Sequence, residues 1–293
     1  MQVQVTCPVN IALLKYWGKV DELNIFPLTS SISLTLNHSH VGSRTTVFTK
    51  NGLKQSQFKL NGKVTQFPPR LLDVLIIAQL RSRLCGKHIA SPFLLVESEN
   101  NFPTAAGLAS SASGTAAFAF ALGKMYSLDG DYTSFSRRGS GSSCRSLLGG
   151  FVLWSSNPEG YLHHSSVQQL FPSSHWPELK VLVCVVAYTF DAGPNAFLLT
   201  ESHNIENILK YLVECFGCTV GVGDSINATD KFTVQCMDSN KYLKIIGIRY
   251  SLSDKPLDQD LLRELPCIPG GIQYLISTEV GDGPQLISLI EDN

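Results

Sequence analysis

The sequence predicts an α+β protein with two domains, and three observations lead to this prediction. Residues 2–8 alternate between apolar and polar side chains, which is the period of a half-buried strand. Residues 105–126 are rich in alanine and almost wholly apolar, which is typical of a buried helix. The stretch 155–177 is polar and interrupted by proline, so we expect a linker or a long surface loop there. The expected domains are therefore 1–178 and 179–293.

The other elements of the first domain follow from the same kinds of pattern. Apolar and polar residues alternate over 32–36, which predicts a second strand. Asn61-Gly62 between alternating apolar positions predicts a hairpin. After two prolines, apolar residues four apart predict a helix that ends at Gly86 and buries one stripe. The stripe consists of Leu72, Ile76, Leu80 and Leu84. A further strand is expected at 151–154.

The second domain is expected to mix strands with one amphipathic helix. Apolar runs predict strands at 179–190 and 196–200. Apolar residues three and four apart predict a helix over 202–216. Two more strands are expected near 241–250 and 271–280.

The composition excludes several broad classes of function. Lys and Arg number 23 against 24 Asp and Glu, so the chain lacks the overall positive charge of a nucleic-acid-binding or anionic-membrane-binding protein. The longest apolar run, 181–190, is about half of the roughly 20 residues that a membrane-spanning helix needs, so no span is expected. Eight cysteines in mostly apolar surroundings indicate reduced thiols and a cytoplasmic location.

A Gly/Ser-rich segment at 101–114 leads directly into the expected buried helix. Amides at a helix N-terminus attract phosphate, and serine hydroxyls can reach the phosphate or its metal ion. The alternative is a helix of small residues that packs closely against a neighbour. On these residues alone, both interpretations remain open.

Three guanidinium groups lie among serines and glycines at 137–146, namely those of Arg137, Arg138 and Arg145. Arginine pairs bidentately with phosphate or carboxylate, so this cluster predicts an anionic substrate. A basic surface loop is the alternative.

Two further segments are candidates for the site. Residues 10–19 carry two lysines and two amphipathic aromatic residues, which either bind a ligand or simply pack and meet solvent. Asp191 follows a strongly apolar strand and precedes a tight turn, which is where functional carboxylates often lie, although a plain turn residue is the alternative.

Taken together and in chain order, these segments resemble the mevalonate diphosphate decarboxylases of the GHMP kinase superfamily. The matching segments are VNIALLKYWGK (9–19), PLTSSISLTL (27–36), NNFPTAAGLASSASG (100–114), RRGSGSSCRSLLGGF (137–151), SHWPELKVLV (174–183), AYTFDAGPNA (187–196) and PGGIQYLISTEVGDGPQ (269–285).

The resemblance implies a carboxy-lyase of the mevalonate route to isoprenoids and sterols. Such an enzyme uses ATP and Mg²⁺ to phosphorylate the tertiary hydroxyl of (R)-5-diphosphomevalonate, and loss of phosphate and carbon dioxide then yields isopentenyl diphosphate. The resemblance also implies a GHMP-kinase-like fold with the active site in a cleft between two domains, and a cytoplasmic homodimer.

The resemblance assigns roles to individual residues. Asp191, Arg145 and Lys15 would be catalytic, with Arg145 holding the substrate carboxylate. The substrate site would be lined by Tyr16, Trp17, Gly18, Lys19, Arg70, Ser140, Gly141, Ser142, Ser143, Cys144 and Arg145. The ATP phosphates would be held by Pro103, Ala106, Gly107, Leu108, Ala109, Ser110 and Ser111, with Ser111 also binding the metal.

The chain departs from the family at one junction. Relatives have a long stretch between the segments that end at Val186 and begin at Ala187, and here the two segments are joined directly. Because one strand cannot occupy two places in a sheet, we expect an incomplete C-terminal domain with Asp191 displaced. One alternative is therefore a catalytically impaired isoform, with weak or absent decarboxylation, that binds nucleotide or a full-length partner. A GHMP small-molecule kinase is a separate alternative.

Overall fold

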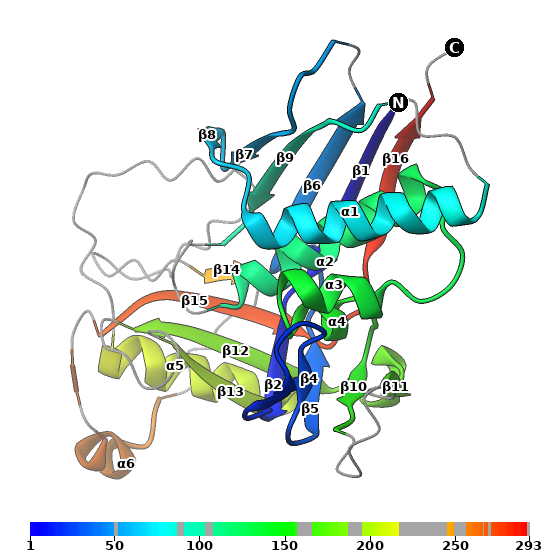
Figure 1. Ribbon diagram of the computed structural model, residues 1–293. Helices are drawn as coiled ribbons and strands as arrows, with labels where there is room; N and C mark the ends of the chain where they lie inside the picture. Colours follow the sequence, from blue (N-terminus) through cyan, green and yellow to red (C-terminus); the bar gives the residue numbers. More distant parts are fainter. Residues whose placement is uncertain are drawn as a thin grey trace. The chain divides into compact units, whose positions relative to one another are not determined.

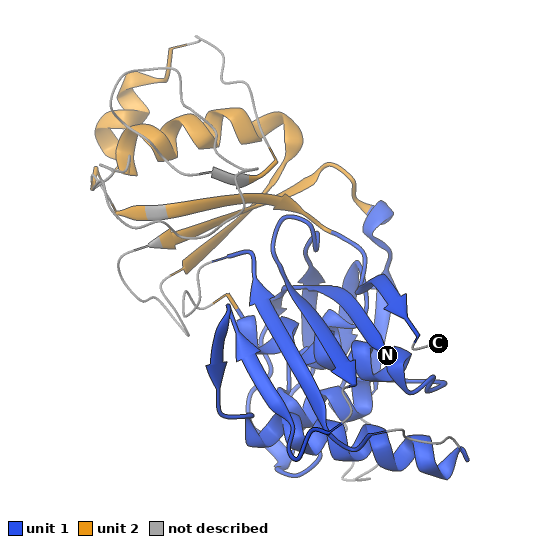
Figure 2. Ribbon diagram, turned by 90° about the horizontal axis from the view of Figure 1, so that it is seen from above, with its two compact units in different colours: residues 1–102, 109–175, 281–293 blue, residues 103–108, 176–280 orange. Residues whose placement is uncertain are grey.

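The structure is a computed structural model, and it describes residues 1–49, 52–86, 91–102, 108–156, 166–186, 195–216, 245–248, 256–265, 267–268 and 271–291. The chain forms two compact units (Figure 2). Unit 1 contains residues 1–102, 109–175 and 281–293, and unit 2 contains residues 103–108 and 176–280. Each unit combines helices with strands, which confirms the predicted fold class. The units are discontinuous in sequence, whereas the two domains expected from the sequence are continuous.

The larger sheet of unit 1 has six strands (Figure 1). In order across the sheet they are β16 (Gln285–Ile290), β1 (Gln2–Pro8), β6 (Gly42–Thr49), β9 (Leu94–Asn100), β7 (Gln57–Leu60) and β8 (Lys63–Thr65). The predicted strand at 2–8 is confirmed as β1, which pairs antiparallel with β16 and β6. The predicted hairpin is confirmed as β7 and β8, with φ of 48° at Asn61 and 77° at Gly62.

A second sheet of unit 1 carries much of the candidate site. Its strands, in order, are β11 (Val167–Phe171), β10 (Phe151–Trp154), β5 (Ser31–Thr35) and β2 (Asn10–Leu14), and β3 (Lys19–Asp21) pairs separately with β4 (Phe26–Pro27). The predicted strands β5 and β10 are confirmed. The expectation of a linker or loop throughout 155–177 is wrong, because β11 pairs with β10 and is followed by the 3₁₀ helix η1 (Ser173–His175). Most of β11 is exposed at the sheet edge, so its sequence lacks an apolar run. Residues 157–165 lie outside the described residues.

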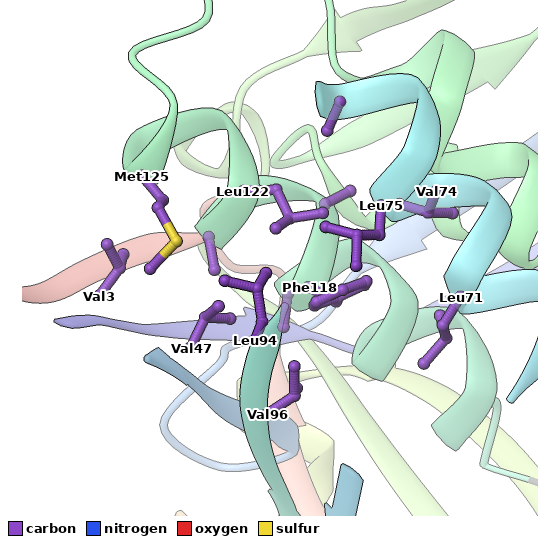
Figure 3. Packing of buried hydrophobic residues seen from close by; sticks show 14 of the residues in the cluster. Val3, Val47, Leu71, Val74, Leu75, Leu94, Val96, Phe118, Leu122 and Met125 are labelled. Atoms are coloured by element: carbon purple, nitrogen blue, oxygen red, sulfur yellow. The ribbon is translucent and has the colours of Figure 1, made fainter. Parts of the chain in front are cut away.

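Two long helices cover the larger sheet and form the main core of unit 1 with it. These are α1 (Pro69–Leu84) and α2 (Ser110–Met125). Side chains from β1, β6 and β9 meet side chains from both helices (Figure 3). The helix α2 is mostly buried, as predicted.

The predicted buried stripe of α1 is wrong. Leu72, Ile76, Leu80 and Leu84 are 36%, 52%, 51% and 87% exposed. The side that packs on the core instead carries Leu71, Val74, Leu75 and Ala78. The helix has two apolar rows, and periodicity alone does not say which of them faces the sheet.

The chain returns to unit 1 at its C-terminal end through close backbone contacts. The amide of Gly281 donates to the carbonyl of Thr35 at 2.8 Å, and the amide of Gly150 donates to the carbonyl of Gly281 at 2.9 Å. A Cβ atom on Gly150, whose φ is +73°, would lie 2.1 Å from the carbonyl oxygen of Phe171. Only glycine fits this position.

Unit 2 is built on a four-stranded sheet. Its strands, in order, are β13 (Asn195–Glu201), β12 (Leu179–Val186), β15 (Ile272–Glu279) and β14 (Ile245–Gly247), and its helices are η2 (Ser202–Asn204), α5 (Ile205–Phe216) and α6 (Gln259–Glu264). The amphipathic helix predicted over 202–216 is confirmed, and α5 packs through Ile205 and Leu209 against Leu182 and Leu275. The predicted strands are confirmed where the chain is described. Residues 187–194, which include Asp191, lie outside the described residues.

None of the helices in the described ranges has the length and apolar character needed to cross a membrane.

Candidate active site

Arg145 is the buried cation at the centre of the candidate site. It lies on the short helix α4 (Ser143–Ser146) and is 3% exposed. Its Nη1 donates a hydrogen bond to Oγ of Ser31 on β5. The Ser31 hydroxyl donates in turn to the carbonyl of Leu14 at 2.6 Å. One serine therefore connects α4, β5 and the end of β2.

Two aromatic rings surround the guanidinium group. The Cζ atom of Arg145 lies 5.7 Å from the ring centroid of Tyr16 and 5.8 Å from that of Trp154, and the two rings are 4.7 Å apart. A Cβ atom on Gly141 would lie 2.9 Å from the Tyr16 hydroxyl and 3.0 Å from Cγ2 of Ile25, so a larger residue here would push these side chains aside. The rings hold the cation by cation–π attraction while excluding water.

The charge of Arg145 is unusually poor in partners. Burial lowers the pKa of its guanidinium from the ordinary value, while Cys144 and Tyr16 act in the opposite direction. An arginine nevertheless stays charged in a protein. Its Nε is buried without a hydrogen-bond partner, and no carboxylate of the described residues forms an ion pair with it. Since a buried charge without a counterion is costly, an anionic ligand fits this position.

Arg137 and Arg138 serve a different purpose from Arg145. Arg137 Nε donates to the carbonyl of Asn24 at 2.9 Å, and its guanidinium lies 4.6 Å from the ring centroid of Phe26. Arg138 Nη1 donates to Oδ1 of Asn24 at 3.3 Å. Both residues lie on α3 (Thr133–Gly139) and hold the turn between β3 and β4. The three-arginine cluster predicted from the sequence is thus divided between holding a turn and forming the candidate site.

The segment from Lys15 to Lys19 lies beside Arg145 through Tyr16. Lys15, Trp17, Gly18 and Lys19 are exposed, and Trp17 is 67% exposed. The amide of Trp17 donates to Oγ1 of Thr29 at 2.9 Å. Lys19 forms a 3.2 Å ion pair with Glu22. Lys15, Trp17 and Lys19 therefore lie exposed on a loop whose backbone is fixed at Trp17.

The segment from Ser140 to Cys144 faces both inward and outward. Ser143 Oγ lies 2.5 Å from Ser136 Oγ, and Cys144 Sγ donates to the carbonyl of Gly141 at 3.1 Å. Burial raises the pKa of Cys144 to about 12, so its thiol is neutral at ordinary pH. Ser140 and Ser142 are half-buried. Solvent, and hence a ligand, can reach the side chains of Ser140 and Ser142.

Asn10, Ser31 and Trp154 contact the site or its backbone without having been predicted as site residues. Asn10 Nδ2 donates to the carbonyl of Ser142 at 3.1 Å and to Ser146 Oγ at 2.6 Å. Ser31 and Trp154 contact Arg145 directly. The one signal for Ser31 and Asn10 was their presence in the segments that resemble the family. Trp154 gave no signal beyond an apolar strand.

The N-terminus of α2 is the described part of the predicted nucleotide segment. Ala109, the N-cap residue, has φ of 50° and provides no side-chain cap. The first amides that donate to its carbonyl are those of Ala112 and Ser113. The amides before them are free of helix partners, as at every helix start. Ser110 is half-buried, Ser111 is exposed and Leu108 is buried. Pro103, Ala106 and Gly107 lie outside the described residues, as Asp191 does.

Arg70 and the expected metal site complete the set of sequence predictions. Arg70 is exposed on the first turn of α1 and forms no hydrogen bond or ion pair with described residues. Within the described ranges, no three His, Cys, Asp or Glu residues cluster as a metal site would require.

Known proteins match nearly the whole chain. A model of the diphosphomevalonate decarboxylase-like N-terminal domain matches residues 7–167, and a model of the mevalonate 5-diphosphate decarboxylase C-terminal domain matches residues 160–287. The diphosphomevalonate decarboxylase of Rattus norvegicus is 43% identical over 395 residues, which covers 98% of this chain and 94% of the rat protein. The diphosphomevalonate decarboxylase of Bos taurus is 45% identical over 199 residues. This match covers 63% of this chain and 49% of the bovine protein.

Solved structures show the same fold. The mevalonate diphosphate decarboxylase from Trypanosoma brucei has a TM-score of 0.76 at 23% identity and covers 98% of both chains. A complex of the protein MDDEF with MVAPP, AMPPCP and magnesium has a TM-score of 0.66 at 22% identity and covers 99% of both chains. The fold is therefore that of the GHMP kinases. Within this class, the chain belongs to the diphosphomevalonate decarboxylase family.

Proposed function

We propose that this chain binds (R)-5-diphosphomevalonate with a magnesium nucleotide and decarboxylates it to isopentenyl diphosphate. The single observation that carries the proposal is the buried Arg145 guanidinium, which has no carboxylate partner among the described residues. A substrate carboxylate would supply the missing counterion. The family's substrate carries such a carboxylate beside the tertiary hydroxyl.

The reaction needs the hydroxyl to become a leaving group. Transfer of a phosphoryl group from ATP supplies this change. The C–O bond then breaks, phosphate departs, and the electron pair of the bond to the carboxylate forms the alkene as carbon dioxide leaves. Arg145 holds the carboxylate in place, Lys15 adds positive charge, and Asp191 orients or deprotonates the hydroxyl.

The first turn of α2 fits the phosphates of a nucleotide. Its free amides, uncapped by any side chain, match the anion-binding geometry of a helix start. Ser110 and Ser111 would add hydroxyl groups, Ser111 also toward Mg²⁺, while Pro103, Ala106, Gly107, Leu108 and Ala109 complete the segment. The diphosphate of the substrate would meet the exposed side chains of Lys19 and Arg70 together with Tyr16, Trp17 and Gly18. Ser140 to Cys144 would form the wall beside it.

We also propose that the chain lacks a segment between Val186 and Ala187, which leaves the C-terminal domain incomplete. Support comes from the rat alignment, which extends over 395 residues although this chain has 293. A protein altered in this way keeps the binding residues of unit 1. Its Asp191, however, follows a segment that is joined directly to Val186, whereas the longer relatives have an intervening stretch there.

The test is a purified sample of the chain supplied with ATP, Mg²⁺ and diphosphomevalonate. We expect carbon dioxide and ADP to be released together. ADP without carbon dioxide would indicate a kinase, and ligand binding without either product would indicate the impaired isoform. No binding of diphosphomevalonate in calorimetry would refute the proposed site.

Arg145→Lys keeps a positive charge but loses the planar fork that pairs with a carboxylate. We expect it to weaken diphosphomevalonate binding by about thirtyfold, which corresponds to about 2 kcal/mol for a buried charge pair. Arg44→Lys is the matched control, because Arg44 is exposed and pairs with Glu99 at 3.5 Å on β6 and β9. Equal losses in the two variants would contradict the role of Arg145.

We further propose a cytoplasmic homodimer. The described cysteines Cys7, Cys85, Cys144, Cys184, Cys215 and Cys267 are free thiols, which supports a reducing compartment. Support for self-association comes from an exposed apolar row on α1.

A further inference from the structure

We propose that the outer face of α1 pairs with the same face of a second copy of this chain, antiparallel and about a twofold axis. The inference rests on the proposed self-association and assigns it to one surface. We call this surface the α1 stripe, which consists of Leu72, Ile76, Leu80 and Leu84.

The α1 stripe is apolar and exposed along the whole helix. Ile76 and Leu80, at its centre, are 52% and 51% exposed, and Leu84 at its end is 87% exposed. The opposite side of the helix is already packed on the core of unit 1 through Val74 and Leu75. A helix that is apolar on two sides is typical of one covered on both. Contiguous apolar surface of this kind marks an interaction site.

Two charges beside the α1 stripe identify the occupant. Asp73 and Arg83 are both exposed, and neither forms an ion pair within the described ranges. Consider an antiparallel pair whose twofold axis passes midway between Ile76 and Leu80. Each residue of one helix then faces the partner residue that lies equally many positions from this midpoint in the opposite direction along the sequence. Asp73 then faces the partner subunit's Arg83, and the reverse pair forms by symmetry. The stripe matches itself in the same register, Leu72 with the partner's Leu84 and Ile76 with the partner's Leu80.

The opposite orientation does not match in this way. A parallel pair about a twofold axis would place Asp73 beside the partner's Asp73 and Arg83 beside the partner's Arg83. Like charges at such positions are unfavourable. The charge pattern therefore favours a second copy of this chain in one orientation, and an isologous contact of this kind closes at two subunits.

The spacing of the stripe also predicts which residues matter most. Residues four apart form one ridge of a helix, and two such ridges pack at a crossing angle of about −50° with the axes about 8–10 Å apart. The helices are then closest at the axis and diverge toward their ends. We expect Ile76 and Leu80 to contribute more than Leu72 and Leu84. Because one stripe provides only part of the roughly 800 Å² per partner of a standard interface, the dimer should depend on concentration.

The first experiment is sedimentation equilibrium of the full chain over a range of concentrations. We expect a monomer–dimer equilibrium that Ile76→Asp weakens at least tenfold and Leu84→Asp weakens less. The matched control is Ile287→Asp on β16, since Ile287 is 50% exposed and lies on another element. Circular dichroism of each variant shows whether it is folded. A monomer at all concentrations overturns both the self-association and the face, and a dimer that tolerates Ile76→Asp overturns the face alone.

The second experiment tests the orientation by charge reversal. Asp73→Arg alone and Arg83→Asp alone should each weaken the homodimer, because each places like charges in contact. An equimolar mixture of the two single variants should recover dimers, since both interhelical pairs are then of opposite charge. The double variant should recover them as well. Single variants that associate as the parent does, or a mixture that gains nothing, would overturn the antiparallel pairing.

Neither experiment depends on the catalytic proposal. A chain that dimerises through α1 without releasing carbon dioxide refutes the activity and leaves this inference intact. A monomeric chain that decarboxylates its substrate does the opposite.

Discussion

A single hydroxyl group, that of Ser31, holds the central arginine of the site. It accepts from Arg145 and donates to the carbonyl of Leu14, which is next to Lys15. Arg145 has few other polar contacts, because its Nε is buried without a partner. Within the described part of the chain, the side chain is positioned by one hydrogen bond and two aromatic rings, so we expect Ser31 to act by positioning Arg145.

We therefore expect Ser31→Ala to destabilise the protein and to weaken substrate binding. Loss of the hydroxyl leaves the buried Arg145 guanidinium without this partner, which costs about 1–3 kcal/mol. The measurements are urea unfolding and calorimetric titration with diphosphomevalonate. Ser31→Thr keeps the hydroxyl and should recover most of the binding.

Ser33 provides the control on the same strand. It is 0% exposed, like Ser31 at 1%, but its hydroxyl has no hydrogen-bond partner among the residues that the structure describes. Ser33→Ala should be neutral or stabilising, because it removes a buried polar group that nothing satisfies. If Ser31→Ala and Ser33→Ala lowered stability and binding equally, the positioning role of Ser31 would be wrong.

The buried thiol of Cys144 gives a residue-scale prediction about pH. Its pKa in the folded protein is raised to about 12 by burial, above the roughly 8.5 of a free cysteine. From about pH 8.5 upward, the unfolded chain loses a proton that the folded protein keeps, so stability falls as pH rises. Over pH 8.5–10 we expect Cys144→Ala to reduce the slope of the unfolding free energy by up to about 1.4 kcal/mol per pH unit.

The measurement is urea unfolding of the parent protein and of Cys144→Ala at several pH values across this range. An identical slope in the parent and in Cys144→Ala would show that the thiol ionises in the folded state.

At the scale of elements, the packing of α2 depends on where its glycines lie. A Cβ atom on Gly123 would lie 2.5 Å from the Tyr132 ring, and Tyr132 is held by a 2.8 Å hydrogen bond from its hydroxyl to the carbonyl of Leu128. A Cβ atom on Gly114 would meet nothing closer than 3.9 Å. The same substitution in one helix therefore has opposite expected effects.

We expect Gly114→Ala to stabilise the protein by about 0.5–1 kcal/mol, which is the advantage of alanine over glycine in a helix. For Gly123→Ala the overpacking cost of about 1–3 kcal/mol exceeds that advantage, so the variant should be less stable. Thermal unfolding of both variants tests the prediction. Stabilisation by both substitutions would show that Tyr132 moves aside freely.

Sequence patterns predicted elements best where one face meets solvent or where a turn needs particular residues. The strand β1 and the turn at Asn61-Gly62 are examples. The buried strand β6 was missed because it carries Ser43 and Thr45 at buried positions, where they bond Ser113 and Ser98. Polar residues in such a strand make it look like a loop until its partners are known.

At the scale of the whole molecule, long-range contacts decide what sequence patterns cannot. The segments that resemble the family contain Tyr16, Ser31 and Arg145, and these residues meet although more than a hundred positions separate the first from the last. Local periodicity carries no information about such pairs. It also could not decide which apolar row of α1 is buried, because that choice is made chiefly by α2 and α3, which pack against this helix.

The pairing of β1 with both β6 and β16 affects the order in which the protein can fold. The ribosome makes β16 long after β1, so at about 5–20 residues per second one edge of β1 has no partner for roughly 15–60 s. All of unit 2 is synthesised during this interval. Until β16 is made, the new chain exposes an open strand edge that a chaperone can bind or that another chain can pair with. The larger sheet of unit 1 is thus completed only after unit 2 has been synthesised, although its other strands are made before unit 2.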